Sequence, residues 1–128
     1  MKYILTFFFL CISAILFGQK PTCKTFKDGE FKIINDSKSD WTWIKREGNL
    51  QIEKSSQSSA KIELIVEWID ECTYTLTPKD RTLKEFEWVP IGGYLIVEII
   101  EVKANSYIQK TTCNFAEIEY ISEMIKLD

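Results

Sequence analysis

The acidic residues from Glu63 to Glu71 come nearest to a catalytic spacing in this chain. Glu63 and Glu67 share one face of a segment with period-two hydrophobicity, and Asp70 and Glu71 follow it directly. Two carboxylates about 5 to 10 Å apart in one cleft can hydrolyse a glycosidic bond. Acidic residues beside Lys61 are also ordinary on a solvated strand face. We favour that surface interpretation, and expect no catalytic residue and no enzyme activity.

The chain contains no histidine, which excludes many kinds of catalytic and metal site. Serine and cysteine hydrolases that use a histidine base, and the usual histidine zinc sites, are ruled out. Gly92 and Gly93 lack the lysine and hydroxyl residue that complete a phosphate-binding loop. The sequence therefore predicts no metal site and no cofactor.

Aromatic side chains are the stronger signal for binding. Trp41 and Trp43 lie two residues apart, hence on one face of a strand, and Trp88 stands in a long loop that leads to Tyr94. These four could stack on a sugar or close over an apolar ligand. Filling the core is the alternative for such residues, and we assign Trp68 to the core. The candidate ligand-binding residues are Trp41, Trp43, Trp88 and Tyr94.

The elements that must position these residues follow a predicted signal peptide, residues 1–19. Lys2 precedes an apolar run over 4–17, and Gly18 and Gln19 follow it. This run is shorter than the ~20 apolar residues that cross a bilayer, so cleavage is favoured over anchoring. We expect one β-rich domain over 20–128, secreted or periplasmic, with no membrane span.

Period-two alternation predicts strands over 26–34, 41–47, 50–54, 61–69, 72–77, 94–103 and 106–112. Gly48-Asn49 favours a two-residue hairpin turn, and the alternation slips between Ile99 and Glu101, which indicates a β-bulge. The tail 115–127 fits a strand or a helix, and the strand is favoured. The sixteen-residue segment 78–93 is a candidate lid or rim.

Seven or eight antiparallel strands with mostly short turns predict an all-β, up-and-down meander, a small lipocalin-like barrel or a sandwich. If the strands alternate in direction, the first and fifth begin at the same end, which brings Cys23 and Cys72 together. We therefore predict a Cys23–Cys72 disulfide, as suits an oxidising compartment. Cys113 remains as a free, inert thiol.

Overall charge and length restrict the partners. The formal net charge is −3 and the isoelectric point about 5.1, with no basic cluster. Nucleic-acid binding requires a lysine and arginine surface that this chain lacks. We expect no nucleic-acid partner.

Three stretches carry a resemblance to a known group. They are Cys23-x-x-Phe26-x-x-Gly29-x-Phe31, Leu50-Gln51-Ile52-Glu53 and Val66-Glu67-Trp68-x-x-x-Cys72-x-Tyr74-x-Leu76. Together they resemble small secreted bacterial proteins that have no established activity, some of which carry the label DNA topoisomerase IV. The chain is too short and too acidic for the nucleotide-binding domain and basic cleft of such an enzyme. We expect no topoisomerase activity.

These observations favour a non-enzymatic, secreted or periplasmic binding module for a small apolar or sugar-like ligand. A protein-interaction module of the cell envelope is the alternative, and a carboxylate-dependent hydrolase is favoured least. The partner is thus an unknown small ligand or an envelope protein.

Overall fold

A computed structural model describes residues 20–34 and 40–127, so the predicted signal peptide, 1–19, lies outside the described residues. The described chain forms eight strands and two short 3-10 turns. In order these are η1 (Cys23–Phe26), β1 (Gly29–Ile34), β2 (Trp41–Glu47), β3 (Leu50–Ser55), β4 (Lys61–Asp70), β5 (Thr73–Pro78), η2 (Lys84–Phe86), β6 (Leu95–Val102), β7 (Ser106–Cys113) and β8 (Tyr120–Leu127).

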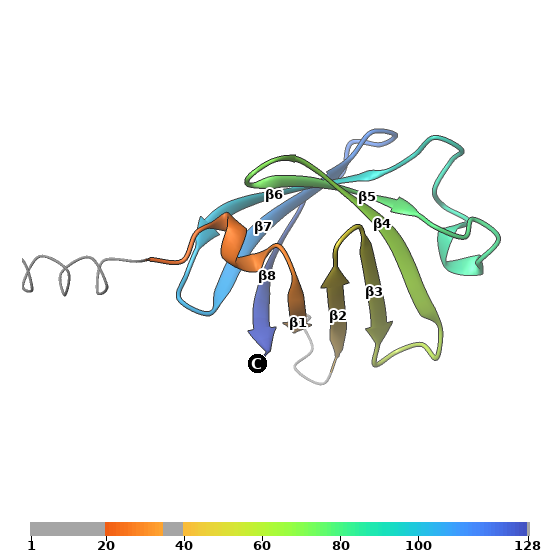
Figure 1. Ribbon diagram of the computed structural model, residues 1–128. Coiled ribbons are helices and arrows are strands. Elements are labelled where there is room, and N and C mark those ends of the chain that lie inside the picture. The colour runs from red at the N-terminus through yellow and green to blue at the C-terminus, as the bar shows by residue number, and fades with distance from the viewer. Residues whose placement is uncertain (1–19, 35–39, 128) are drawn as a thin grey trace, which may run out of the picture.

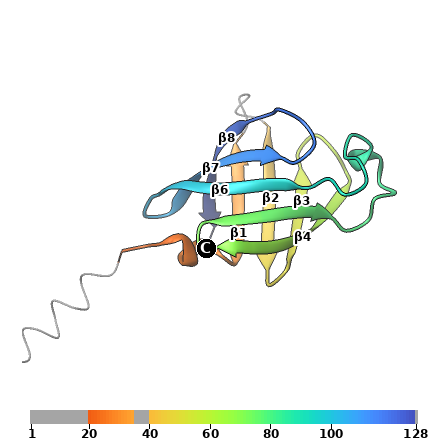
Figure 2. The same cartoon turned by 90° about the horizontal axis from the view of Figure 1, so that it is seen from above.

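The strands close into an antiparallel up-and-down barrel (Figures 1 and 2). Each strand pairs with the next in sequence, and β1 closes the ring against β8 through Phe31 opposite Lys126. The all-β meander is thereby confirmed, and of the two predicted architectures it is the barrel. The tail that fitted either a strand or a helix forms β8.

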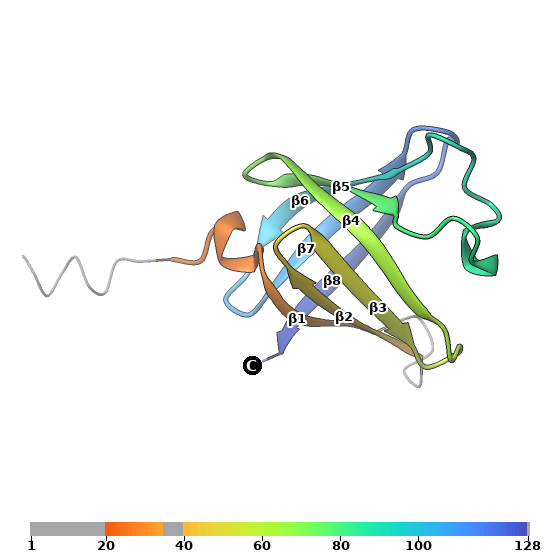
Figure 3. The same ribbon diagram turned by 45° about the vertical axis from the view of Figure 1, so that its right-hand side comes forward.

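The two ends of the barrel differ. At one end, called here the η1 end, the strands are joined by short turns and η1 lies against the barrel. At the other, the loop end, lie the longer connections, including 79–94 between β5 and β6. Figures 1 and 3 show η1 and the 79–94 connection on opposite sides of the barrel.

Local sequence explains two of the irregular positions. Gly48 has a φ of +60° and Asn49 does not have a positive φ, as in a type II′ hairpin turn, which needs glycine at its first central residue. Glu47 pairs with Leu50 across it. The register shift between Ile99 and Glu101 confirms the predicted bulge.

The first strand starts later than its sequence pattern predicts. Residues 23–26 form η1, and β1 begins only at Gly29, whose φ of +139° suits glycine. Phe26 is fully buried, with its ring 5.3 Å from that of Tyr107. Burial of this aromatic side chain across the η1 end outweighs the extended pattern, because large apolar area removed from water dominates core energetics.

The Cys23–Cys72 disulfide is confirmed, with the two Cα atoms 5.3 Å apart. It joins η1 to the turn between β4 and β5. The core around it includes Phe26, Phe31, Ile99 and Met124. A second apolar cluster, which includes Leu64, Val66, Leu76 and Phe86, lies along β4, β5 and η2, and Trp68 packs against both.

Within residues 20–34 and 40–127, no helix has the length and apolarity needed to cross a membrane. In the same part of the chain, no three histidine, cysteine or acidic side chains are gathered as metal ligands.

Candidate functional site

The barrel interior contains a cavity of about 470 Å³. Its apolar lining includes Ile33, Ile44, Leu76, Leu95, Val97 and Met124, and its polar lining includes Gln51, Glu53, Tyr74, Gln109, Thr111 and Ser122. Protein interiors are normally packed as densely as organic crystals, so an interior space of this size is a candidate ligand site.

The β2–β3 hairpin determines which polar side chains point inward. Its two-residue turn pairs Arg46 with Gln51 and Ile44 with Glu53. Ile44 is only 2% exposed and faces the core, and alternate residues of a strand share a face. Arg46, Gln51 and Glu53 therefore face the interior as well.

Arg46 is a buried cation whose N–H groups are all hydrogen-bonded to the protein. The residue is 1% exposed. Its Nε donates to the Lys27 carbonyl at 2.7 Å and one terminal nitrogen donates to the Phe26 carbonyl at 2.6 Å. The same terminal nitrogen donates to the Tyr107 hydroxyl, and the other donates to Tyr74 Oη and Gln51 Oε1. These bonds use all five guanidinium donors, which offsets the cost of burial.

Aromatic rings complete the surroundings of Arg46. The guanidinium carbon lies 4.9 Å from the centroid of the Phe31 ring, 5.6 Å from Trp68 and 4.6 Å from Tyr74. Burial lowers the pKa of Arg46, but its interactions with the Tyr74 and Tyr107 hydroxyls outweigh this and leave that pKa above its ordinary value. The side chain is thus a fixed cation that ties η1 to the barrel.

Gln51 links this cation to the cavity. Its Oε1 accepts from Arg46 at 2.9 Å, and its Nε2 donates to Glu53 Oε2, also at 2.9 Å. The amide has one orientation that meets both neighbours, because a guanidinium offers only donors and an ionised carboxylate only acceptors. Glu53 is therefore oriented by Gln51 from the η1 side.

Glu53 is held far less completely than Arg46. Among the described residues, Gln51 alone donates a hydrogen bond to its carboxylate, and no lysine or arginine forms an ion pair with it. Burial raises the pKa of Glu53, while the Gln51 hydrogen bond and the Arg46 charge oppose that rise only in part. Its remaining accessible surface faces cavities, since it borders two of them.

The second cavity, of about 270 Å³, adjoins the first at the loop end. Glu53 and Leu95 line both. Ile62, Phe86 and Trp88 contribute apolar surface to the smaller cavity. Glu53 thus borders both cavities, and the smaller one extends to η2.

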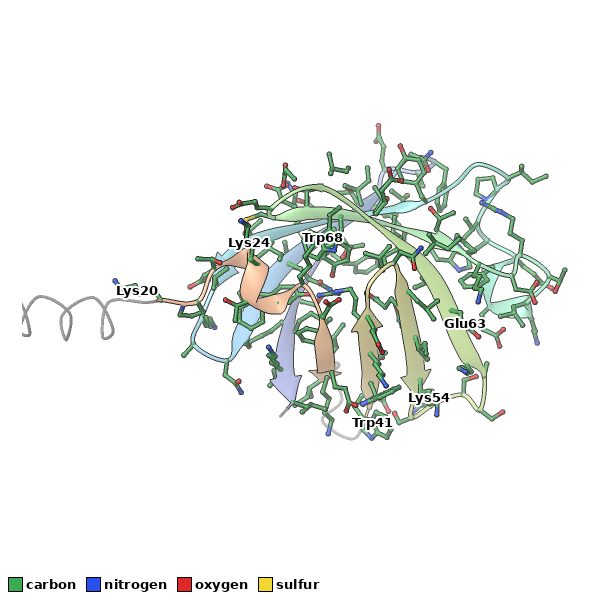
Figure 4. All side chains as sticks on the ribbon, in the orientation of Figure 1. Lys20, Lys24, Trp41, Lys54, Glu63 and Trp68 are labelled. Atoms are coloured by element: carbon green, nitrogen blue, oxygen red, sulfur yellow. A yellow bond between two sulfur atoms is a disulfide. The ribbon has the colours of Figure 1, made fainter. Side chains whose placement is uncertain are left out.

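Trp41 and Trp43, two of the predicted ligand-binding residues, lie on the outer face of the barrel. Trp41 is 36% exposed, and lysine ammonium groups stand over both rings, Lys32 over Trp41 and Lys54 over Trp43. Figure 4 places Trp41 at the lower end of β2, away from Trp68. Neither tryptophan lines the two cavities.

Trp88 and Tyr94, the other two predicted residues, lie in the segment 78–93 and next to it, at the loop end. Trp88 lines the 270 Å³ cavity, and both residues border an apolar recess of about 30 Å³. The segment is fixed to the barrel by Phe86, which is buried in one cluster with Leu64 and Leu76, and it is braced internally by Arg81, which donates to the carbonyls of Pro90 and Gly93. It forms a rim.

The acidic residues from Glu63 to Glu71 do not enter the barrel. Glu63 is paired with Lys61 and Lys79 on the outside of β4, and Glu71 is paired with Lys24. Figure 4 shows Glu63 on the outward side of β4. The two interior cavities contain none of these carboxylates.

Cys113, the predicted free thiol, ends β7 and is half-buried without a disulfide partner among the described residues. Its Sγ donates to the Ala116 carbonyl at 3.4 Å. The cavities lie elsewhere.

Sequence reasoning missed the polar residues that line the site, namely Gln51, Glu53 and Gln109, together with Arg46 behind them. A usable signal was present in the hairpin. Once the Gly48-Asn49 turn sets the register and Ile44 is placed inside, Glu53 must share its face.

In comparisons with protein-family models, curated proteins and solved structures, no significant match to this chain was found.

Proposed function

We propose that this protein is a non-enzymatic binding module that holds a small ligand inside the barrel, between the Arg46 network and the loop end. The observation that carries the proposal is the 470 Å³ cavity. Binding sites for small molecules typically enclose about 300 to 1,000 Å³ and combine apolar walls with a few placed polar groups.

The distribution of packing supports a binding role for this half of the barrel. At the η1 end Phe26, Phe31 and Tyr107 are fully buried and fill the interior. Toward the loop end the inward positions carry smaller or polar side chains, such as Thr111 and Ser122, and leave space. We therefore place the proposed binding site in the barrel interior and not at Trp41 and Trp43, the outer tryptophans that the sequence favours. Trp88 lies at the rim of this site.

We further propose that the protein is secreted or periplasmic. The Cys23–Cys72 disulfide is consistent with an oxidising compartment. The apolar residues before 20 supply the predicted export signal.

The test uses the neutral fluorophore N-phenyl-naphthylamine, whose emission rises in apolar surroundings. We expect the purified domain to bind it with saturable, one-to-one enhancement, and we expect Thr111→Phe to abolish the enhancement. Thr111 faces the cavity from β7, opposite Val97, so a phenyl group there occupies the ligand space. Absence of enhancement in the wild-type protein would contradict the proposal.

Two matched variants locate the site. Thr112→Phe adds the same volume on the outer face of β7, and Trp43→Ala removes an outer aromatic side chain. We expect both to bind the fluorophore like the wild-type protein. Loss of binding in Trp43→Ala, with binding retained in Thr111→Phe, would place the site on the outer face instead.

The remaining sequence-based expectations stay predictions. They are the resemblance to the small secreted bacterial group, the absence of enzyme and topoisomerase activity, and the alternative of a protein-interaction module. A pull-down from envelope extract with Thr111→Phe as bait tests the last of these separately from ligand binding.

A further inference from the structure

We propose that the cavity takes an amphipathic organic cation, a protonated amine on an apolar body, whose ammonium group pairs with the Glu53 carboxylate. This inference rests on the proposed function and names the chemical class of its ligand.

The formal charges on the cavity walls have one sign. Of the described residues that line the two cavities, the charged ones are Glu53, which borders both, and Glu85, on the smaller one. No lysine or arginine is among those lining residues. An anionic ligand, such as a fatty acid, would bring its charge toward these carboxylates without a cation to pair with it, and like charges in a confined site repel.

Arg46 is close but is not available to a ligand. Its five donors are taken by two carbonyls, two tyrosine hydroxyls and the Gln51 side chain. It does not line either cavity. Its charge acts on the site only through space and through Gln51, so the group that a ligand meets is the carboxylate.

Glu53 has the unused capacity that an ammonium group requires. Oε2 accepts one hydrogen bond, from Gln51, and none of the described residues donates to Oε1. A carboxylate can accept about four hydrogen bonds, so this lining residue keeps unused acceptor capacity. A partly buried carboxylate with a raised pKa gains most from a cation, because the cation relieves its desolvation.

The apolar lining of the cavities indicates that the ammonium group of the ligand is attached to an apolar body. Ile44, Leu76 and Val97 form the wall around the larger cavity, and Phe86 and Trp88 continue it at the smaller one. Burying an alkyl or aromatic body there is favourable in proportion to its apolar area. A small hydrophilic cation would leave these walls unfilled, which is why the ligand is amphipathic.

The experiment compares three ligands of one shape: octylammonium, octanol and octanoate, each titrated against bound N-phenyl-naphthylamine at neutral pH. We expect octylammonium to displace the fluorophore at a concentration at least about tenfold below that of octanol, and octanoate to be the weakest. Glu53→Gln should remove the preference for octylammonium over octanol, so that the two displace the fluorophore at similar concentrations.

A matched charge control is Glu98→Gln, on the outer face of β6 next to Val97. It makes the same change in net charge outside the barrel, and we expect it to keep the wild-type order of the three ligands. If Glu98→Gln lost the preference as fully as Glu53→Gln, the effect would be one of overall charge and the inference would fail.

The outcomes also separate this inference from the proposed function. If octanol binds and octylammonium binds no better, or if octanoate is the tightest, the ligand class is wrong while the binding cavity stands. If Thr111→Phe leaves displacement by all three ligands unchanged, the cavity is not the site and both proposals fail.

A pH series supplies an independent readout. An alkylammonium stays protonated below neutral pH, so its affinity should fall when acid protonates Glu53. The other groups facing the two cavities are Glu85 on η2, Tyr74 on β5 and Tyr120 on β8, with Arg46 behind Gln51. Of these only Glu85 carries a second carboxyl group. An identical acid loss in Glu53→Gln would assign it to Glu85 and overturn the pairing with Glu53.

Discussion

Arg46 and Glu53 are two ionisable side chains inside the same barrel, and they differ in how fully the protein satisfies their hydrogen-bonding groups. Arg46, at the η1 end, has five hydrogen bonds and three neighbouring aromatic rings. Glu53, toward the loop end, has one hydrogen bond and an open cavity beside it. A fully compensated buried charge stabilises a particular fold, whereas an incompletely compensated one leaves bonding capacity for another molecule.

The surroundings of the two residues follow the same division. The η1 end is covalently closed by Cys23–Cys72 and filled by aromatic rings. The loop end carries longer connections and polar inward residues. Natural proteins keep unsatisfied groups and unfilled space mainly where they serve function, so the contrast supports the proposal that a ligand binds at the loop end.

The largest expected loss of stability comes from removing the Arg46 side chain at the centre of its hydrogen-bond network. Arg46→Met leaves the Phe26 and Lys27 carbonyls and the Gln51 side-chain oxygen without their donor, whereas the two tyrosine hydroxyls keep the hydrogen bond between them. At about 1 to 2 kcal/mol for each group that loses its donor, the loss is about 3 to 6 kcal/mol, a large share of the stability of a small domain. Urea unfolding followed by tryptophan fluorescence measures it.

Two further variants keep this test informative if Arg46→Met fails to fold. Arg46→Lys retains the charge with three donors and should recover part of the loss. Arg81→Met removes the chain's other arginine, which bonds only within the 78–93 segment, and should cost far less. Equal losses for Arg46→Met and Arg81→Met would remove the special role assigned to the η1 end.

The next largest loss of stability is expected from removing the Cys23–Cys72 disulfide. Replacing Cys23 and Cys72 by alanine frees a loop that spans 49 residues in sequence, and should cost about 3 to 4 kcal/mol by the entropy of loop closure. The loss is expected at the η1 end, so fluorophore binding should persist below the new melting temperature. Calorimetry and fluorophore titration measure the two quantities.

Cys113→Ala is the control for this change, since it removes a thiol and leaves the disulfide intact. We expect its stability to stay within about 0.5 kcal/mol of the wild-type value, as for most substitutions away from special features. If the double cysteine variant lost ligand binding while still folded, the η1 end and the loop end would not be independent.

Most of the fold could be predicted from the sequence because its signals are local. Alternating residues from Lys61 to Ile69, the Gly48-Asn49 turn and the slip after Ile99 each depend on a few neighbouring residues, and each has its counterpart in the structure. The start of β1 could not be predicted in this way, because Phe26 is placed by its contact with Tyr107, which lies far along the chain.

The site was harder to predict, because β3 does not follow the rule that the apolar face of an alternating strand points to the core. In β3 the half-buried Leu50 and Ile52 face outward, while Gln51 and Glu53 face inward. A hydrophobic pattern read alone puts Ile52 inside. What decides otherwise is the pairing with β2, where Ile44 and Arg46 occupy the inner face and Trp41 and Trp43 the outer one.

The smallest expected change in stability comes from replacing Glu53 in the ligand-free protein. This change is a gain, whereas the other substitutions are expected to destabilise the protein. Glu53→Gln keeps an acceptor for Gln51 and removes a desolvated charge, so at neutral pH the free protein should become more stable, by about 0.5 to 1.5 kcal/mol. Urea unfolding at several pH values measures it against Glu98→Gln, whose carboxylate is exposed.

The pH dependence of that gain follows from the raised pKa of Glu53. Between the unfolded pKa, about 4.3, and the higher folded one, the native state binds more protons, so wild-type stability falls as pH rises through this window. Glu53→Gln lacks this fall, and its advantage should therefore vanish in acid and be complete at neutral pH. A stability loss at neutral pH instead would make Glu53 a supporting member of the Arg46 network, and the distinction between the two ends would fail.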